Sequence, residues 1–315
     1  MKNKALKIVF MGTSQFAVPS LESLAGSPHQ LMGVVSQPDR PRGRGRRLQP
    51  TPVKEAALRY GIPVLQFERI RDEQAVQGVK ELVPDLIVVV SYGQILPAAL
   101  LQAPPWGCIN VHASLLPDYR GAAPIQRAIM DGRTITGVTT MLMDVGMDTG
   151  DILLREEVPI SDEIDHGGLE TRLAEVGAKL LLKTVAGLSA GSIRPVPQEH
   201  DKATYAAMIS REDELISWTW PAREIHNRIR ALSPFPGAYT IFQGERLKLY
   251  RSRVLEESGQ GQEGIFLFAT SDGLVVQTGQ GALEILEVQK AGKKRMPARE
   301  FIKGYPLVQG SRLSG

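Results

Sequence analysis

The chain has 315 residues, of which 43% are hydrophobic and 23% are charged, and its formal net charge at pH 7 is +3. This composition is that of an ordinary globular protein, and the length makes two domains more natural than one. The small net charge does not by itself indicate a nucleic-acid-binding protein. The single cysteine, Cys108, excludes an intrachain disulfide and a cysteine-rich zinc site.

No apolar run reaches the ~18 residues of a membrane span, so we expect no membrane association. Residues 6–11 form too short an apolar run for a secretory signal, and a turn follows at Gly12. Both observations favour a cytoplasmic protein.

Apolar strands and amphipathic helices alternate through the first 190 residues. Strands are predicted at residues 6–11, 31–35, 62–65, 86–90 and 107–111, with 138–143 and 152–160 as further candidates. Helices are predicted at residues 18–25, 51–60, 72–82, 124–130 and 169–188. This alternation predicts an α/β domain with an open, mainly parallel, Rossmann-like sheet.

The character of the chain changes after Gly191. Residues 194–202 contain two prolines and no periodicity, which is typical of a linker. A helix at 222–232 precedes five predicted strands, at 238–242, 247–254, 264–269, 274–277 and 283–288. Short strands separated by glycine-bearing turns favour a small β-barrel of the OB type. We therefore expect a catalytic domain over 1–192, a linker over 193–209 and a smaller OB-like domain over 210–315.

A polar pair lies at the end of the predicted strand 107–111. Asn110 and His112 are two residues apart, so a strand would point both side chains to one face of the sheet. In open α/β sheets, ligands bind beyond the carboxyl ends of the strands. An Asn-x-His sequence alone more often means a strand end and a surface histidine. The apolar, proline-containing segment 114–117 that follows is suited either to wall a pocket for a flat heterocycle or simply to pack on the core.

A carboxylate, Asp148, lies in a later loop between Gly146 and Gly150. Glycines permit tight turns that would aim this carboxylate at a neighbouring strand end, although an Asp beside a glycine is most often a turn residue. An amide, an imidazole and a carboxylate suffice for acyl transfer to an amine without a metal. The histidines have no metal-ligand spacing and the first turn lacks a G-x-G-x-x-G motif, so neither a metal site nor a dehydrogenase is indicated.

Basic residues gather in two segments. Five arginines lie within eight residues, and the residues from 211 onward hold 15 Lys and Arg against 12 Asp and Glu, which is the whole net excess. The five are Arg40, Arg42, Arg44, Arg46 and Arg47. Arginine supplies planar forks for phosphates, but a lone basic run is as often a solvated loop.

Several of these motifs resemble one known family. The sequences Asn110-x-His112, Ser114-Leu115-Leu116-Pro117 and Arg120-Gly121-x-x-Pro124-Ile125, with Asp148 between its glycines, are similar to the signature of the folate-dependent formyltransferase superfamily. Within it, the chain most resembles the members that act on methionyl-tRNA. The resemblance spans nearly the whole chain and is weakest over the C-terminal strands.

This resemblance implies transfer of a formyl group from 10-formyltetrahydrofolate, without a metal, to the α-amino group of methionine on initiator tRNA, for translation initiation. It assigns two further sets of residues. The folate contacts it implies are Ser114, Leu115, Leu116, Pro117, Val90, Tyr92, Gln94, Ile95 and Leu96. The tRNA contacts it implies are the five arginines of residues 40–47 together with Lys293, Lys294 and Arg295.

The catalytic roles implied for Asn110, His112 and Asp148 suit their chemistry. Asn110 can donate an N–H to the formyl oxygen as negative charge develops there, and His112 can donate a hydrogen bond or a proton to the same oxygen. Asp148 either accepts the proton lost by the attacking nitrogen, directly or through water, or holds His112 in its protonated form. The sequence leaves both roles open.

Two rival functions remain. An amino-sugar formyltransferase would have similar catalytic residues but little use for the arginine loop. An RNA-binding module that has lost activity would not need Asn110, His112 and Asp148 together. We expect the chain to act as a monomer on initiator methionyl-tRNA and the folate co-substrate.

Overall fold

The computed structural model describes residues 5–42, 47–255, 262–305 and 310–314. The chain divides into two compact units whose sequences interleave. The N-terminal unit comprises Met1–Gly121, Ile135–Pro159 and Glu170–Ala206, and the C-terminal unit comprises Ala122–Thr134, Ile160–Leu169 and Ala207–Gly315. Residues 193–206, part of the predicted linker, therefore pack within the N-terminal unit, and the domain boundaries at 192 and 210 stay predictions.

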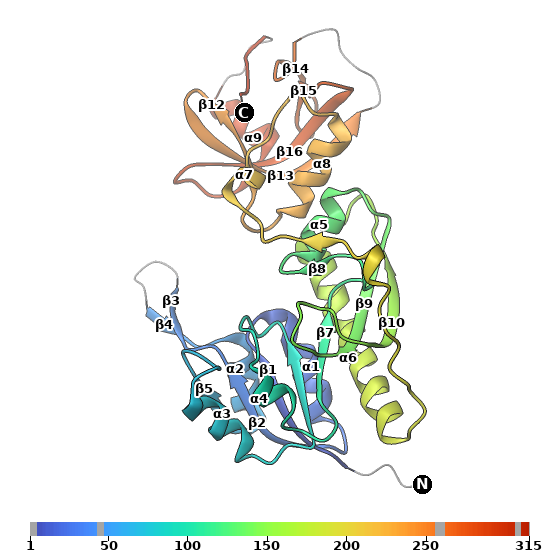
Figure 1. The fold of residues 1–315 in the computed structure, drawn as a ribbon. Coiled ribbons are helices and arrows are strands. Elements are labelled where there is room, and N and C mark those ends of the chain that lie inside the picture. Colours follow the sequence, from blue (N-terminus) through green and yellow to red (C-terminus); the bar gives the residue numbers. More distant parts are fainter. Residues whose placement is uncertain (1–4, 43–46, 256–261, 306–309, 315) are drawn as a thin grey trace. The chain divides into compact units, whose positions relative to one another are not determined.

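A seven-stranded sheet forms the centre of the N-terminal unit, in the order β10-β9-β7-β6-β1-β2-β5 (Figure 1). Its strands are β1 (Lys7–Gly12), β2 (Gln30–Ser36), β5 (Val64–Gln66), β6 (Leu86–Val90), β7 (Cys108–His112), β9 (Ile135–Leu142) and β10 (Ile152–Pro159). The five strands from β5 to β7 are parallel, and β9 and β10 are antiparallel. The predicted α/β fold with a mainly parallel sheet is confirmed.

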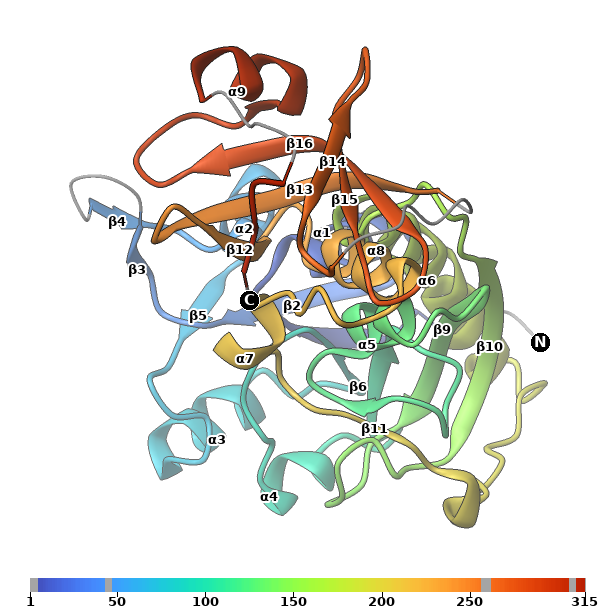
Figure 2. The same ribbon diagram turned by 90° about the horizontal axis from the view of Figure 1, so that it is seen from above.

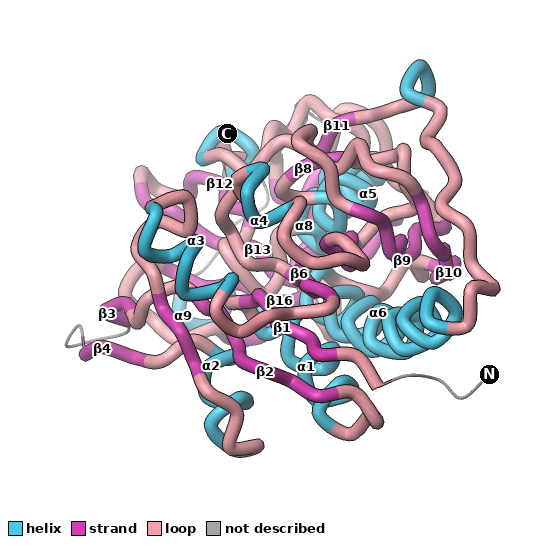
Figure 3. Tube along the Cα trace, turned by 60° about the horizontal axis from the view of Figure 1, so that its bottom comes forward, coloured by secondary structure: helices cyan, strands magenta, loops and turns pink. Residues whose placement is uncertain are grey.

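Helices cover both faces of this sheet, which is why all five residues of β6 are buried (Figure 3). They are α1 (Val18–Ala25), α2 (Pro52–Arg59), α3 (Glu73–Lys80), α4 (Ala98–Leu101) and α6 (His166–Ser189), with a 3-10 turn η1 (Gln15–Ala17). Thr51 caps α2 by accepting a hydrogen bond from the Lys54 N–H.

The two faces carry different residues of β7. A Cβ placed on Gly177 of α6 would lie 3.0 Å from Val111 and 3.4 Å from Val138, so α6 packs on the face that bears Val111. Cys108, by contrast, belongs to a core cluster with residues of α3 and α4. Because side chains alternate along a strand, Asn110 and His112 share the face of Cys108 and point away from α6.

Smaller elements complete the N-terminal unit. They are the hairpin β3 (Arg40–Arg42) and β4 (Arg47–Gln49), the parallel pair β8 (Arg120–Gly121) and β11 (Tyr205–Ala206), and the 3-10 turn η2 (His200–Lys202). The β8–β11 pair joins the end of the loop after β7 to a segment more than 80 residues later.

The C-terminal unit is an antiparallel sheet in the order β12-β13-β16-β15-β14, with β17 paired to β16 (Figure 2). The strands are β12 (Ala238–Phe242), β13 (Glu245–Leu255), β14 (Phe266–Ala269), β15 (Leu274–Gln277), β16 (Ala282–Lys290) and β17 (Met296–Pro297). Residues 312–314 pair with Ile241 of β12 and Ile265 beside β14, so the last residues join the two edge strands. This closes the sheet as the predicted barrel requires.

Four helices belong with this sheet: α5 (Pro124–Met130), α7 (Arg211–Glu214), α8 (Ala222–Ala231) and α9 (Ala298–Gly304). Ile225 and Ile229 of α8 lie in one core cluster with Leu249 and Ile285 of the sheet. The Arg127 guanidinium of α5 donates to both carboxylate oxygens of Asp213, at 2.8 and 2.9 Å. This fork ties α5 to the C-terminal unit, although α5 comes from the middle of the N-terminal sequence.

Candidate active site

The carboxyl ends of three parallel strands, β1, β6 and β7, meet at one edge of the N-terminal sheet. The Thr13 hydroxyl after β1 donates to the carbonyl of Tyr92 after β6 at 2.8 Å, and Asn110 of β7 pairs with Val89 of β6. The chain continues from β1 to β2 on one side and later to β6 on the other, so the strand order reverses here. Open α/β sheets bind ligands at such a point.

The three predicted catalytic residues come together at this edge. The Asn110 amide donates to Asp148 Oδ1 at 3.3 Å, and Nδ1 of His112 lies 3.7 Å from Asp148 Oδ2. His112 is 6% exposed and the side chain of Asp148 is 15% exposed. The structure therefore brings together the three side chains that the sequence singled out.

The ring of His112 has a defined orientation. Its Nε2 lies 3.0 Å from the carbonyl oxygen of Tyr119, which can only accept a hydrogen bond, so Nε2 carries a proton and donates it. Nδ1 is then the ring nitrogen with a free electron pair when the ring is neutral, and it is the one that faces Asp148.

The loop that carries Asp148 depends on special backbone conformations. Asp148 itself has a φ of 53°, in the left-handed region that costs most side chains energy. Its Oδ2 accepts the N–H of Gly121 at 2.8 Å. A Cβ on Gly150 would collide with the carbonyl of Leu142, so the glycine near Asp148 is required by close packing.

Residues predicted to contact folate divide into buried and accessible groups. The side chains of Val90, Tyr92, Leu96, Ser114 and Leu116 are buried in the protein core, and any contact with a ligand would use their backbone. Ile95, in contrast, is 83% exposed. Leu115, Pro117 and Gln94 are half-buried, and Gln94 accepts the Ile70 N–H at 2.7 Å.

Residues 92–95, which follow β6, are suited to hold a flat ring. Gly93 has a φ of 87°, and a Cβ there would meet only the Gln37 amide nitrogen, at 3.6 Å, so the backbone is open at this turn. The buried hydroxyl of Tyr92 has no hydrogen-bond partner among the described residues, and burial raises its pKa to about 12. An accessible backbone and an exposed Ile95 are features that a folate ring could use.

The predicted arginine loop corresponds to the β3–β4 hairpin. Arg42 and Arg47 form a backbone pair, and the guanidinium of Arg40 lies 2.8 Å from the Glu68 carboxylate on the surface. Arg44 and Arg46, and the side chains of Arg42 and Arg47, lie outside the described residues. The predicted tRNA contacts of these arginines stay predictions.

The base of this hairpin is anchored. Lys54 donates to Asp39 at 2.7 Å and to Gln66 at 2.8 Å, and Gln66 donates to the other oxygen of Asp39 at 2.7 Å. The hydrogen bond from Lys54 holds the pKa of the Asp39 carboxyl below its usual range. Asp39 thus fixes the start of the hairpin, and its charge is compensated before any phosphate approaches.

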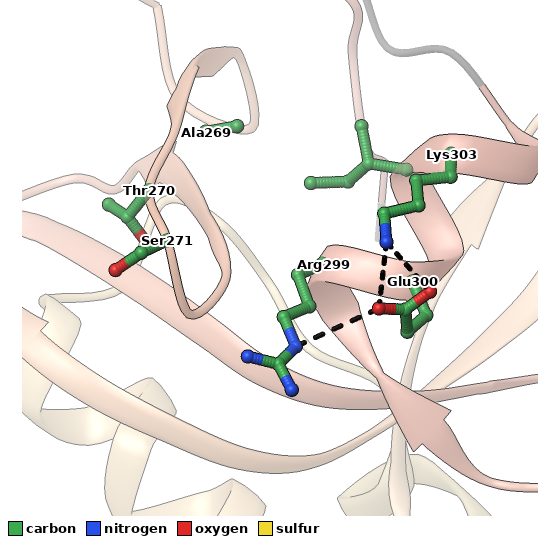
Figure 4. Close-up of a pocket in the computed structure, with 7 residues that line it drawn as sticks. Ala269, Thr270, Ser271, Arg299, Glu300 and Lys303 are labelled. Atoms are coloured by element: carbon green, nitrogen blue, oxygen red, sulfur yellow. Dashed lines mark hydrogen bonds and ion pairs between the residues drawn. The ribbon is translucent and has the colours of Figure 1, made fainter.

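The predicted C-terminal tRNA residues follow β16. Lys293 and Lys294 are exposed, and the guanidinium of Arg295 stacks 3.6 Å from the centre of the Tyr250 ring. A hollow of about 450 Å³ lies elsewhere on this unit, beside α9 (Figure 4). Arg299 and Lys303 point toward Glu300 there and both pair with it, at 3.8 and 3.0 Å, so one carboxylate offsets part of their charge.

Sequence reasoning missed two buried polar residues behind Asp148. Arg120 is 2% exposed and Gln198 is 5% exposed, and the two are hydrogen-bonded at 2.6 Å. Arg120 appeared only as part of a motif, with no role. Gln198 lies in a stretch without periodicity, so no local signal marks it.

Two absences apply to the part of the chain that the structure describes. No helix there combines the length and the apolar character needed to cross a membrane. No cluster of three or more His, Cys, Asp or Glu side chains there could hold a metal ion.

Comparisons with known families match both units. The formyl transferase family matches residues 6–185, and the formyl transferase C-terminal domain matches residues 208–306. Together these cover most of the chain. The gap between them, residues 186–207, contains the predicted linker except its last two residues.

Individual proteins match over most of their length. The chain is 53% identical to the methionyl-tRNA formyltransferase of Syntrophomonas wolfei over 97% of this chain and 98% of that one. It is 50% identical to the enzyme of the same name from Pelobacter propionicus, over 98% and 96%. An N-formyltransferase from Helicobacter canadensis, solved with folinic acid and dTDP-3-aminofucose, has the same fold at 20% identity. Its TM-score is 0.65 over 90% of this chain and 99% of that one.

Proposed function

The chain belongs to the methionyl-tRNA formyltransferase family, and from this premise we propose how it transfers the formyl group of 10-formyltetrahydrofolate to the α-amino group of methionine on initiator tRNA. The observation that carries the proposal is the convergence of Asn110, His112 and Asp148 at the carboxyl edge of the sheet. The folate supplies an activated formyl group when bound. The residues of this chain orient the reactants and manage charge and protons.

Asn110 stabilises the negative charge that develops on the formyl oxygen. Its amide nitrogen has two hydrogens, and one of them donates to Asp148. The second is available for the formyl oxygen. One such preorganised donor typically contributes ~10²–10³ in rate.

His112 already donates its Nε2–H to Tyr119, so the neutral ring has no N–H left for the formyl oxygen. Instead, Nδ1 takes the proton that the attacking amine must lose, and this proton passes to N10 of tetrahydrofolate as the bond between N10 and the formyl carbon breaks. Asp148 stabilises the imidazolium at 3.7 Å. Of the two roles left open by the sequence, this geometry favours support of His112, because the Asp148 carboxylate already accepts hydrogen bonds from Asn110 and Gly121. Nδ1 of His112 makes no hydrogen bond to a described residue, so it is better placed to receive a proton.

The folate lies beside residues 90–96 and 114–117, and the tRNA contacts the β3–β4 hairpin and residues 293–295. Arginine forks on the hairpin and lysines after β16 provide two positive segments for phosphates. We further propose that the protein acts as a monomer in the cytoplasm, with these two substrates as its partners and no metal.

The test is formyl transfer from 10-formyltetrahydrofolate to three acceptors: initiator Met-tRNA, free methionine and a dTDP-linked amino sugar. We expect transfer to Met-tRNA alone. Transfer to the amino sugar but not to Met-tRNA would favour the sugar-modifying alternative. Tight Met-tRNA binding without transfer to any acceptor would favour an inactive RNA-binding protein.

A further inference from the structure

The Asp148 loop is held from behind by a buried amide. Gln198 Nε2 donates to the carbonyl of Asp148 at 2.9 Å and to the carbonyl of Gly150 at 2.7 Å. These two bonds clamp the backbone on both sides of Thr149. The clamp acts on the residue whose φ of 53° is otherwise unfavourable.

A buried guanidinium fixes the orientation of this amide. Arg120 donates to Gln198 Oε1 through Nε at 3.1 Å and through Nη2 at 2.6 Å. Since Arg120 can only donate and the two carbonyls can only accept, the amide has one possible orientation. Arg120 Nη2 also lies 3.1 Å from His200 Nδ1, which must accept the hydrogen bond.

The same short strand reaches the carboxylate itself. Arg120 and Gly121 form β8, and the Gly121 N–H donates to Asp148 Oδ2 at 2.8 Å. A Cβ on Gly121 would lie 2.8 Å from the carbonyl of Ala206 in β11, and its φ is 118°, so the close pairing of β8 with β11 requires glycine. β8 therefore holds the Asp148 side chain directly and the Asp148 backbone through Gln198.

The charge of Arg120 is unusual for so buried a group. No carboxylate oxygen among the described residues lies within ion-pair distance of its guanidinium, although it is 2% exposed. Burying a cation without an ion-pair partner costs free energy, and a hydrophobic side chain could fill the volume more cheaply. Its presence is better explained by a function than by stability.

We propose that Arg120 and Gln198 are positioning residues for formyl transfer, which hold the Asp148 loop so that its carboxylate faces His112. The inference rests on the proposed role of Asp148. Neither residue touches the reacting atoms, and both act through Asp148. A displacement of a catalytic group by about 1 Å can cost ~10²-fold in rate.

The experiment compares Gln198→Glu with the wild type, measuring kcat, KM for both substrates and thermal stability. The introduced carboxylate would keep the bonds from Arg120 but could not donate to the two carbonyls, so the loop would shift while the fold gains an ion pair. We expect kcat to fall by up to ~10²-fold, with both KM values within about threefold and the melting temperature close to that of the wild type. A folded Gln198→Glu protein with wild-type kcat would overturn the proposal.

A matched control is available in the C-terminal unit. Gln277 is 5% exposed, and its Nε2 donates to the carbonyls of Thr278 at 3.0 Å and Gly281 at 3.1 Å. Gln277→Glu makes the same substitution at a position that has no proposed role in formyl transfer. We expect it to lower stability and leave kcat unchanged; an equal loss of kcat in both variants would reduce the Gln198 effect to general destabilisation.

A double mutant separates this inference from the proposed function. In an Asp148→Ala background, Gln198→Glu should cause little further loss of kcat, because both substitutions disrupt the same functional unit. A full additional loss would show that Gln198 acts independently and would overturn the inference. Wild-type kcat in Asp148→Ala would overturn the role of Asp148 and this inference together, whereas normal Gln198→Glu turnover beside an inactive Asp148→Ala would overturn the inference alone.

Discussion

Each unit has an asparagine and a buried histidine close together in the chain, and the two pairs are used differently. In the C-terminal unit, Asn227 Oδ1 accepts from Arg230 at 3.1 and 3.0 Å, and both ring nitrogens of His226 have partners, Ser252 at 3.0 Å and the Asp162 carbonyl at 3.1 Å. In the N-terminal unit, Asn110 makes one hydrogen bond to Asp148.

The same contrast holds for His112, because just one of its ring nitrogens is hydrogen-bonded to a residue that the structure describes. Nε2 donates to the Tyr119 carbonyl, whereas Nδ1 is 3.7 Å from Asp148, too far for a hydrogen bond. This difference shows that the burial of a polar side chain does not by itself identify a functional site. A buried polar group that can still donate or accept a hydrogen bond is a candidate for a catalytic role. A buried polar group whose hydrogen bonds are all made within the protein is expected to contribute to stability.

The largest expected effect concerns His112 and Asp148, which should behave as a unit. Each alanine variant should lose ~10²-fold or more in kcat, and the double variant should be little worse than the worse single one, because residues that act together are not additive. A kinetic double-mutant cycle measures this. Fully additive losses would show two independent roles and would end the account of Asp148 as a support for the ring.

A second prediction tests whether the β3–β4 hairpin binds RNA. Replacing Arg40, Arg42, Arg44, Arg46 and Arg47 with glutamine should lower kcat/KM for Met-tRNA and leave folate affinity unchanged. Each lost phosphate contact should flatten the salt dependence of tRNA binding by roughly 0.7–0.9 log units per log unit of salt.

The control for this variant replaces Arg155 and Arg172, exposed arginines of the same unit outside both basic segments. Their loss should change neither the salt slope nor kcat/KM by more than general charge effects allow. An unchanged slope in the hairpin variant as well would make the hairpin an ordinary solvated loop. RNA recognition would then rest on the C-terminal unit.

The smallest effect is on stability and belongs to the C-terminal unit. Burial lowers the pKa of His226 from its ordinary value of 6.5, so the native state resists protonation that the unfolded chain accepts. The contribution of neutral His226 is therefore complete above pH 6.5 and is lost as the pH falls below that value. His226→Gln should flatten the fall in melting temperature between about pH 7.5 and 5.5, measured by thermal unfolding.

Some of this slope should remain in that variant. Burial also lowers the pKa of His166, which lies in the same unit. A variant with the full wild-type slope would show that His226 is not the group that titrates. A variant whose melting temperature falls more steeply with falling pH than that of the wild type would contradict the prediction.

The sequence predicted most of the fold because its signals are local. Apolar runs such as residues 86–90 become buried strands, and two residues at i and i+2 of a strand must share a face, which placed Asn110 beside His112. The glycines around Asp148 indicated a tight loop. The barrel followed from short strands and turns, but the role of residues 312–314 in joining its edges did not.

The parts that were missed depend on contacts between distant segments. Gln198 meets Asp148 across 50 residues, and β8 pairs with β11 across more than 80. Two-residue strands carry no periodicity, and an isolated glutamine looks the same in a linker and in a core. For the same reason, the packing of α5 with the C-terminal unit could not be read from its own sequence.

The most direct test of the account compares Asn110→Ala with Asn227→Ala in one single-turnover assay of formyl transfer to Met-tRNA, with melting temperatures measured in parallel. Asn110→Ala should lower the rate by ~10²–10³-fold and leave the fold intact, because the lost hydrogen bond forms mainly in the transition state. Asn227→Ala should cost about 1–3 kcal/mol of stability, because it leaves the buried Arg230 guanidinium short of a partner, and leave the rate unchanged. An Asn110→Ala variant that retains more than about a third of the wild-type rate would contradict the account.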